Sequence, residues 1–444
     1  MPPIKPLAAR FFYTLLLCLL FPFIFFKLLW RGRLQPEYLQ HIGERFGFYN
    51  ALPPTPSRNA GEAANESLRD FSTPPILWLH AVSVGETRAT VSLIEQLCRD
   101  YPQHQILLTH TTPTGRATSE QLYGERVLRV YLPYDYPFAV QRFLRHFKPE
   151  LGMLMETEIW FNLIHACEKN HVPLLLLNAR MSEKSARGYG RLATLSREAL
   201  RALSGIAAQT VADAQRLAAL GGANISVMGN LKFDIAPPAA MLELGKVLRE
   251  QFGATRPVFL AASTREGEEE LLLDAWQAAS PQALLVLVPR HPQRFDAVAE
   301  LIKKRGLKLQ RRNENKTVSP DIQVLLGDSM GEMFAYYAAA DLAFIGGSLL
   351  PFGGQNLIEA CAVGTPVLIG AHTFNFADAT RLAIDAGAAQ RVSDAEELVQ
   401  VAANLLGNAN TVSAMRAAGL RFVINHQGAT DKAMQLIQRH ITSV

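Results

Sequence analysis

Short apolar runs recur along the chain from Ile76 onward, and amphipathic stretches of helical length separate most of them. This alternation is typical of parallel strands that helices cover on both faces. The first series of candidate strands occupies residues 76–80, 105–110, 127–132, 151–155, 173–177, 205–208 and 225–228. We therefore predict an α/β fold with a doubly wound parallel sheet.

A second series of candidate strands follows a break in the pattern, at residues 257–262, 284–288, 322–326, 341–345, 366–369 and 388–392. The break contains Gly229 and Pro237-Pro238, and we interpret residues 231–238 as a hinge. The sequence thus predicts two Rossmann-like domains, residues 76–230 and 239–444, with a last helix that can return to the first domain. Two such domains facing a cleft place the carboxyl ends of both sheets across it, where ligands bind.

The N-terminal segment differs, because no charged residue interrupts Phe11 to Phe26. These 16 residues fall short of the ~20 that cross a bilayer, but the run reaches Trp30 if the Lys27 ammonium extends to the membrane surface. We predict a membrane anchor within residues 1–50, and the alternative is a buried core helix. The sequence does not decide whether residues 7–30 span the membrane or lie on it.

The residues after the apolar run predict a second membrane contact. Leu34, Tyr38, Ile42 and Phe46 recur at every fourth position, which favours a helix over residues 34–48 at the membrane interface. Positive charge from Arg31, Arg33 and Arg45 would attract anionic lipid on the cytoplasmic side. We predict that deleting residues 1–30 leaves the fold and ligand binding intact and releases the protein from membranes. Residues 51–75 contain five prolines and predict a linker or mobile loop.

Charge and cysteine content narrow the class of partner. The net charge is +4, and the first fifty residues alone carry six Lys or Arg against two Glu. The rest of the chain is balanced, so we expect no nucleic-acid partner. The four cysteines are far apart, and no CxxC, HExxH or EF-hand pattern occurs. We therefore expect neither a disulfide framework nor a metal site, and a reducing cytoplasm suits the chain.

Polar residues follow the predicted strands of the first domain at their carboxyl ends. Glu86 comes shortly after strand 76–80, with Ser83 and Gly85 beside it. Its carboxylate has the chemistry to take a proton from a hydroxyl, or it only complements a helix start. Glu156 and Glu158 follow strand 151–155, and one of them is alternatively a helix-capping partner. Arg180, after the next strand, offers charge to an anionic substrate, or belongs to a solvated basic face.

The second domain repeats this arrangement, with Ser263, Pro289-Arg290 and Met330-Gly331-Glu332 each following a strand. The longest such stretch runs from Phe344 to Ile369, where a strand, the Gly346-Gly347 and Gly353-Gly354 pairs and a helical pattern succeed one another. Glycine lets the backbone approach a ligand closely, and the start of a helix favours an anion. The alternative is an ordinary α/β turn that binds nothing. Candidate residues in this stretch are Gly353, Gly354, Asn356, Leu357, Ile358 and Glu359.

Ten ordered segments together resemble the 3-deoxy-D-manno-octulosonic acid (Kdo) transferase family of lipopolysaccharide biosynthesis. They are HAVSVGET, YLPYD, METEIW, NARMS, GNLKFD, STREGEE, VPRHP, GDSMGE, GGSLLPFGGQNLIEA and GAHTFNF. The resemblance covers nearly the whole chain, and only residues 51–75 are longer than the family pattern. It implies the glycosyltransferase B fold and transfer of Kdo from CMP-Kdo to a lipid A precursor, lipid IVA, at the cytoplasmic face of the bacterial inner membrane.

The resemblance also implies roles for individual residues. Glu86 matches the proposed general base, and Glu156 and Lys232 match positions assigned to stabilising the transition state. Lys232 comes from the resemblance alone, because the pattern places it only in the hinge. The local pattern does not choose between Glu156 and Glu158. The CMP-binding segments of the family match Pro289-Arg290, Met330-Gly331-Glu332 and Asn356-Leu357-Ile358-Glu359.

The expected chemistry suits these residue types. The Kdo donor is a ketose, and its displacement by a hydroxyl passes through a transition state with oxocarbenium character. Inversion in one step needs one base, and CMP leaves with a single phosphate. No DxD pattern occurs in the chain, so we expect a reaction without metal or cofactor.

Two other classes of function remain as alternatives. One is another glycosyltransferase B-fold enzyme, such as a heptosyltransferase or a nucleotide-sugar epimerase, which would use a diphosphate donor. The other is a membrane-tethered module that holds a nucleotide sugar without turnover. The sequence leaves open the number of Kdo residues transferred and the oligomeric state.

Overall fold

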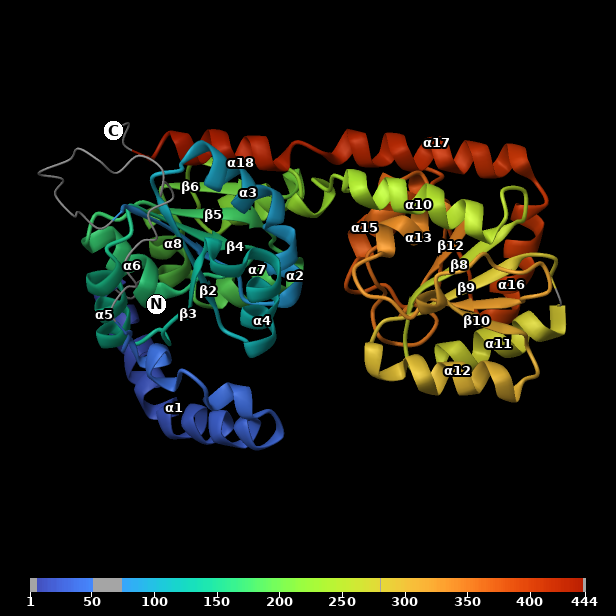
Figure 1. The fold of residues 1–444 in the computed structure, drawn as a ribbon. Helices are drawn as coiled ribbons and strands as arrows, with labels where there is room; N and C mark the ends of the chain where they lie inside the picture. The colour runs from blue at the N-terminus through green and yellow to red at the C-terminus, as the bar shows by residue number, and fades with distance from the viewer. Residues whose placement is uncertain (1–5, 51–73, 280, 442–444) are drawn as a thin grey trace, which may run out of the picture. The chain divides into compact units, whose positions relative to one another are not determined.

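The computed structural model describes residues 6–50, 74–279 and 281–441 (Figure 1). The chain divides into two compact units. The first comprises Met1–Asp234 and Gly428–Val444, and the second comprises Ile235–Gln427. The second unit therefore begins and ends earlier than the expected range 239–444, and the last helix belongs to the first unit. The interpretation of residues 51–75 lies almost entirely outside the described residues.

The first unit is built on a seven-stranded parallel sheet with the order β3-β2-β1-β4-β5-β6-β7. Its central strands are buried along their whole length, as expected where helices cover both faces of a sheet. The strand order reverses between β1 and β4, which makes the carboxyl ends of these two strands the expected place for a ligand. The strands are β1 (Ile76–His80), β2 (Gln105–His110), β3 (Leu128–Tyr131), β4 (Leu151–Met155), β5 (Leu174–Ala179), β6 (Gly205–Ala208) and β7 (Ile225–Val227).

Helices pack on both faces of this sheet (Figure 1). One face includes α18 from the far end of the chain, whose Ala433, Met434 and Ile437 are buried in the same cluster as Leu77 and Leu79. The helices are α2 (Val84–Ala89), α3 (Val91–Asp100), α4 (Pro113–Tyr123), η3 (Gly124–Arg126), α5 (Pro137–Phe147), α6 (Phe161–Lys169), α7 (Glu183–Arg191), α8 (Ala193–Ala202), α9 (Val211–Ala219), η4 (Leu231–Phe233) and α18 (Ala429–Gln438).

The second unit contains another seven-stranded parallel sheet, with the order β10-β11-β9-β8-β12-β13-β14. Here the order reverses between β8 and β12. The strands are β8 (Val258–Thr264), β9 (Leu284–Pro289), β10 (Leu309–Arg311), β11 (Val324–Leu326), β12 (Leu342–Ile345), β13 (Val367–Ile369) and β14 (Ala389–Arg391). The helices are α10 (Ala239–Phe252), α11 (Glu268–Ala279), η5 (Pro292–Arg294), α12 (Phe295–Lys304), η6 (Arg312–Glu314), α13 (Met333–Ala339), α14 (Ile358–Ala362), α15 (Ala377–Asp385), α16 (Ala395–Leu406) and α17 (Ala409–His426).

Strand β10 is the one described strand that the sequence pattern did not predict. It lies at the sheet edge, pairs only with β11 among the described strands, and has three residues of which one is buried. An edge strand has no need of a continuous apolar run, so the pattern that reveals a buried strand is absent from it.

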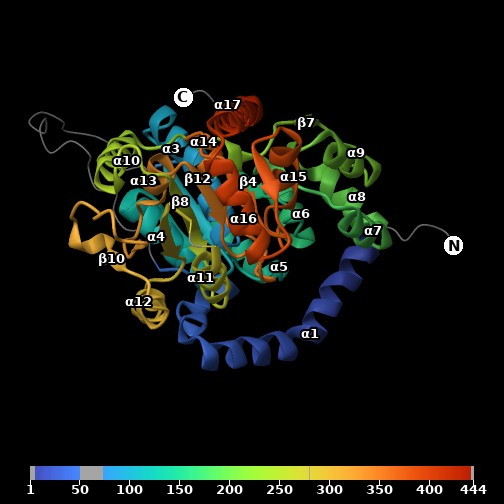
Figure 2. The same ribbon diagram turned by 90° about the vertical axis from the view of Figure 1, so that its right-hand side faces the viewer.

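The N-terminal apolar run forms helix α1 (Pro6–Leu34), which is bent (Figure 2) and contains Pro22. Of its residues only Leu28 and Gly32 are buried, so the alternative of a buried core helix is wrong. The helix is long and apolar enough to cross a membrane by length and composition. It nevertheless lies against the first unit through polar contacts: Arg10 pairs with Glu198 at 2.9 Å, and the Tyr13 hydroxyl donates to Asp135 at 2.9 Å.

The predicted interfacial helix over residues 34–48 is not formed. Two short 3-10 turns, η1 (Pro36–Leu39) and η2 (Ile42–Phe46), take its place, and His41 between them has left-handed backbone with φ of 53°. The expected lipid contact of Arg45 is also wrong. Arg45 is buried, its guanidinium lies 4.0 Å from the centre of the Tyr131 ring, and it donates to the Thr111 carbonyl. Arg31 and Arg33 remain exposed.

Candidate active site

Glu86 lies at the carboxyl end of β1, in the first turn of α2. Its backbone N–H donates to the Ser83 side chain, and the Ser83 hydroxyl donates back to Glu86 Oε1 at 2.9 Å. The other carboxylate oxygen accepts the Val82 N–H at 2.8 Å. Ser83 thus caps α2, and the Glu86 carboxylate accepts the N–H of the residue before the cap, so these three bonds fix the side chain in one position. Glu86 thus stands at a helix start, and this position is compatible with a second role.

The acidity of Glu86 is suited to proton transfer near neutral pH. Burial raises the pKa of its carboxyl from 4.5 to about 7, against the lowering effect of the Val82 N–H, and the negative charges of Glu156 and Glu158 raise it further. A general base works best when its pKa is close to the working pH. Glu86 therefore combines a fixed position at the reversal point of the sheet with the acidity of a base.

Glu156 and Glu158 follow β4, next to β1 in the sheet, and the structure distinguishes them. Glu156 has left-handed backbone with φ of 58°, and its Oε1 lies 3.9 Å from Lys232 Nζ. Glu158 instead accepts the Trp160 indole N–H at 2.7 Å, and burial raises the pKa of its carboxyl. Glu156 is thus the carboxylate paired with a cation, whereas Glu158 is held by an aromatic neighbour.

Lys232 belongs to the turn η4, which a small amide network holds in place. The Asn230 side chain accepts the Lys232 N–H at 3.0 Å, and Asn178 Oδ1 accepts the Leu231 N–H at 3.1 Å. Asn178 is fully buried at the end of β5 and has φ of 52°. These bonds bring the predicted hinge residue to Glu156. Local pattern could not find Lys232, because what places it is a bond between positions 53 residues apart.

The remaining candidates of the first unit surround this group. Gly85 and the Arg180 side chain are exposed. The Arg180 backbone is bonded to the loop after β4. Its N–H donates to the backbone carbonyl of Glu156, and its own carbonyl accepts the Thr157 hydroxyl at 2.7 Å. The structure therefore brings Ser83, Glu86, Glu156, Glu158 and Lys232 together and leaves Arg180 at the rim.

In the second unit, Ser263 and Arg290 lie at the carboxyl ends of the neighbouring strands β8 and β9. Ser263 has left-handed backbone with φ of 56°, and the next carbonyl, that of Thr264, accepts the Arg290 N–H at 2.9 Å. Pro289 ends β9 and is buried. The backbone of Arg290 is thus fixed directly to the last residue of β8.

The segment Met330-Gly331-Glu332 forms a loop before α13. Gly331 has φ of 81°, and Met330 is 58% exposed. Glu332 accepts the Ser329 hydroxyl at 2.6 Å and lies 3.3 Å from Arg312 Nε. Helix α13 begins only at Met333. The loop is therefore ordered by its own side chains, with Met330 left free of the core.

The glycine-rich loop after β12 is closed at its base. The Gly354 N–H donates to the Gly347 carbonyl at 2.7 Å, and the Gln355 N–H donates to the Gly346 carbonyl at 3.0 Å. Gly353 and Gly354 have φ of 93° and 75°, conformations that favour glycine. The loop is a compact turn that leads directly into Asn356.

The expected anion site at the start of the following helix is not supported. Helix α14 has five residues and begins at Ile358, so Asn356 and Leu357 precede it. The Asn356 side chain already accepts the Ile358 N–H at 3.1 Å and donates to Glu359 at 3.1 Å. The candidate groups of this segment are therefore the side chains of Asn356 and Glu359, rather than the helix dipole.

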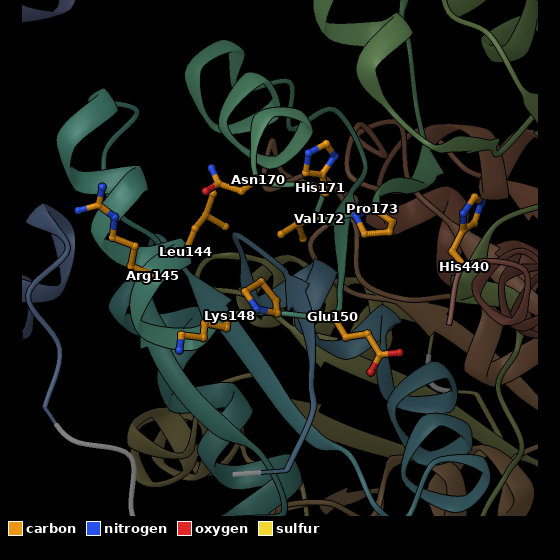
Figure 3. A pocket seen from close by; sticks show the side chains of 10 residues that line it. Leu144, Arg145, Lys148, Glu150, Asn170, His171, Val172, Pro173 and His440 are labelled. Carbon is orange, nitrogen blue, oxygen red and sulfur yellow. The ribbon is translucent and has the colours of Figure 1, made fainter. Parts of the chain in front are cut away.

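A cavity of about 630 Å³ lies at the opposite, amino end of β4 and β5 in the first unit (Figure 3). Arg145, Lys148 and His171 line it, but they stand at the carboxyl ends of α5 and α6. Cations at such helix ends balance the negative end of the helix dipole. Their position at helix ends therefore accounts for these residues without a ligand. Within the described residues, no group of three or more His, Cys, Asp or Glu has the arrangement of a metal site.

Solved structures define the class of the fold. A glycosyltransferase from Rickettsia africae aligns with a TM-score of 0.53 at 15% identity, covering 84% of this chain and 100% of its own. A UDP-GlcNAc 2-epimerase from Neisseria meningitidis, bound to UDP-GlcNAc, aligns with a TM-score of 0.56 at 15% identity, covering 82% and 100%. Two doubly wound parallel sheets of this kind are the glycosyltransferase B fold.

Sequence relatives define the family within that class. Residues 40–235 match the family model described as 3-deoxy-D-manno-octulosonic-acid transferase (kdotransferase). A 3-deoxy-D-manno-octulosonic acid transferase of Bordetella pertussis is 46% identical over 82% of this chain and 86% of its own. The Haemophilus influenzae protein of the same name is 36% identical over 97% of this chain and 99% of its own. The chain belongs to the Kdo transferase family.

Proposed function

We propose that this Kdo transferase takes Kdo from CMP-Kdo and transfers it to the lipid A precursor lipid IVA in lipopolysaccharide biosynthesis. The observation that carries the proposal is the Glu86 carboxylate, fixed beside the Glu156–Lys232 pair with a pKa of about 7. Family membership favours a transferase over a module without turnover, and over heptosyltransferases and epimerases.

The reaction proceeds in one inverting step. The acceptor hydroxyl oxygen forms a bond to the anomeric carbon of Kdo while the bond from that carbon to the CMP phosphate breaks, and the hydroxyl proton passes to Glu86. Positive charge develops on the sugar, and the Glu156 carboxylate stabilises it. Lys232 offers its ammonium to the donor's anionic groups. In the second unit, Arg290, Asn356 and Glu359 bind the CMP portion.

The direct test uses purified protein, CMP-Kdo and lipid IVA, with the mass of the product as the measurement. We expect a mass increase of one or more Kdo residues, and the increment gives their number. The same acceptor with a UDP-sugar or an ADP-heptose should give no product. Transfer from a diphosphate donor, with none from CMP-Kdo, would contradict the proposed donor.

The pH profile tests the acidity of the base. Because the carboxyl of Glu86 titrates near pH 7, kcat/KM should fall about tenfold per unit as the pH drops below 7. The raised pKa also means that the folded state holds this proton more tightly than the unfolded state does. Its stabilising effect is therefore complete below pH 4.5 and lost as the pH rises through 7. Glu86→Gln should abolish that part of the pH dependence of unfolding. A kcat/KM that stays constant within measurement error between pH 5.5 and 7 contradicts this assignment.

Metal independence is a separate prediction. The proposed donor loses a single phosphate, and the groups proposed to neutralise it are side chains of this protein. Activity after exhaustive chelation with EDTA should stay within about twofold of the untreated rate, because no step of the proposed reaction needs a Lewis acid. Loss of activity that added Mg²⁺ restores would show that a metal takes part.

Membrane association is proposed through α1, in the plane of the cytoplasmic leaflet of the inner membrane. The large side chains Phe11, Phe12, Leu19, Phe23 and Phe26 are each 59–71% exposed. Contacts hold the helix to the first unit from Arg10 to Phe21. A helix fixed along a domain cannot also cross a bilayer, whereas its outer apolar face suits the lipid interface.

A further inference from the structure

Glu268 is a fully buried carboxylate that binds backbone N–H groups from two separate loops. It is the first residue of α11, the helix that follows β8 in the chain. Its Oε2 accepts the N–H groups of Arg265 at 2.9 Å and of Gly347 at 2.6 Å, and its Oε1 accepts that of Leu349 at 3.0 Å. None of the residues assigned to catalysis or donor binding above is among these partners.

A buried carboxylate is costly unless it has good hydrogen-bond partners. Bonds from backbone N–H groups to an ionised carboxylate are among the stronger ones in proteins, and three of them meet here. An apolar residue at this position would fill the space but leave the N–H groups of Gly347 and Leu349 buried without a partner. The charge of Glu268 is therefore used to fix the backbone at this point.

The backbone that Glu268 fixes leads to the proposed donor-binding side chains. The Gly347 carbonyl accepts the Gly354 N–H and so closes the glycine-rich loop. Asn356 lies two residues after Gly354. On the other side, the same carboxylate fixes Arg265, next to the Thr264 carbonyl that holds the Arg290 backbone. One carboxylate thus joins the turn after β8 to the loop after β12, across the reversal point of the sheet.

We propose that Glu268 is a positioning residue of the donor site, which holds the glycine-rich loop in the shape that binds the CMP portion of the donor. This inference rests on the proposed function, since it takes the second unit as the donor-binding unit. Glu268 acts through Gly347 and does not touch the donor.

The test is Glu268→Gln in the full-length protein, with CMP binding measured by calorimetry. Glutamine has nearly the same shape but replaces one acceptor oxygen with an N–H donor, so at least one backbone N–H loses its partner. We expect the Kd for CMP to rise by about 10–100-fold, as loss of a bond to a charged group implies. The KM for the lipid acceptor should change less than twofold.

Two control variants separate positioning from stability. Thr365→Val removes a buried hydrogen bond to the Tyr337 carbonyl in the same unit and leaves the bonds of Glu268 intact. It should lower Tm without changing the Kd for CMP. Glu270→Gln makes the same chemical change at an exposed position of α11 and should change neither. If Glu268→Gln lowers Tm but keeps the Kd within twofold, the residue is only structural and the proposal is overturned.

A measurement on the unaltered protein covers the case in which Glu268→Gln does not fold. Peptides that contain residues 346–350 should be protected from hydrogen–deuterium exchange even without CMP, because Glu268 holds two of their N–H groups. Exchange at the rate of an open loop overturns the proposal. If the unaltered protein does not bind CMP at all, the proposed donor itself is contradicted. If it binds CMP and only the results on Glu268 fail, the positioning role alone is overturned.

Discussion

Glu86→Gln is expected to lower turnover by about 10²–10⁴-fold, the usual contribution of a general base, and to leave the Kd for CMP nearly unchanged. Glutamine cannot take the proton of the acceptor hydroxyl, but its side-chain carbonyl can still accept a backbone N–H. The variant can keep the bond from the Val82 N–H, and its contact with Ser83 reverses, so that the glutamine N–H donates to the hydroxyl. It therefore removes the proton transfer while changing the cap little.

The measurement is the single-turnover rate with saturating CMP-Kdo, together with Tm. Glu95→Gln is a matched control, because Glu95 is an exposed glutamate on the next helix of the same unit. It should leave both quantities unchanged. Turnover close to that of the unaltered protein in Glu86→Gln would mean that the residue is a helix cap and nothing more.

Replacing Phe11, Phe12, Leu19, Phe23 and Phe26 of α1 by serine should lower partitioning onto phospholipid vesicles by at least about 10³-fold. Each of these exposed side chains gains about 1.5–3 kcal/mol when it enters an apolar environment. Activity on a vesicle-borne acceptor should fall in parallel, since confinement to one surface raises the effective concentration. Activity on a detergent-solubilised acceptor should stay within about twofold.

Cosedimentation with vesicles at high salt measures the partitioning, because salt removes the electrostatic contribution of Arg31 and Arg33. Leu192→Ser and Val211→Ser serve as controls, since both are exposed apolar residues of the first unit outside α1. If the variant with all five serine substitutions still sediments completely with the vesicles, the proposal that α1 lies in the membrane interface is refuted.

The contacts of α1 change the expected effect of deleting residues 1–30. Removing residues 1–30 would take away the Tyr13 hydroxyl from the buried Asp135 carboxylate, which also holds the Asn162 and Leu163 N–H groups. Burial already raises the pKa of that carboxyl to about 7. The expectation that such a deletion leaves the fold untouched is therefore replaced: α1 is part of the packing of the first unit as well as its apolar surface.

The buried strands of both sheets could be predicted from the sequence, because a strand covered on both faces needs a continuous apolar run. Positions that depend on distant contacts could not. Residues 34–48 have helical spacing, yet Arg45 is drawn into the protein by Tyr131 and Thr111, and two short turns result. Long-range packing overrode a local pattern there.

The candidate site shows the same division. Glu86, Glu156 and Glu158 were found because each follows a strand, and the carboxyl ends of parallel strands share one edge. Lys232 lies in a turn whose position is set by Asn178, far away in sequence, and only the family resemblance pointed to it. Glu268 lay in a quoted motif, but its importance appears only when its three backbone partners are seen together.

The return of α18 to the first unit has a consequence for biosynthesis. The Asp234 carboxylate accepts the N–H groups of Gly428 and Thr430, so the chain leaves and re-enters the first unit at one place. During synthesis on the ribosome, the first unit remains without α18 until roughly 190 residues of the second unit have been made. At about 5–20 residues per second this delay is on the order of 10–40 s. During that interval Leu77 and Leu79 lack their partners on α18, and the part of the sheet face that α18 covers is exposed to chaperones.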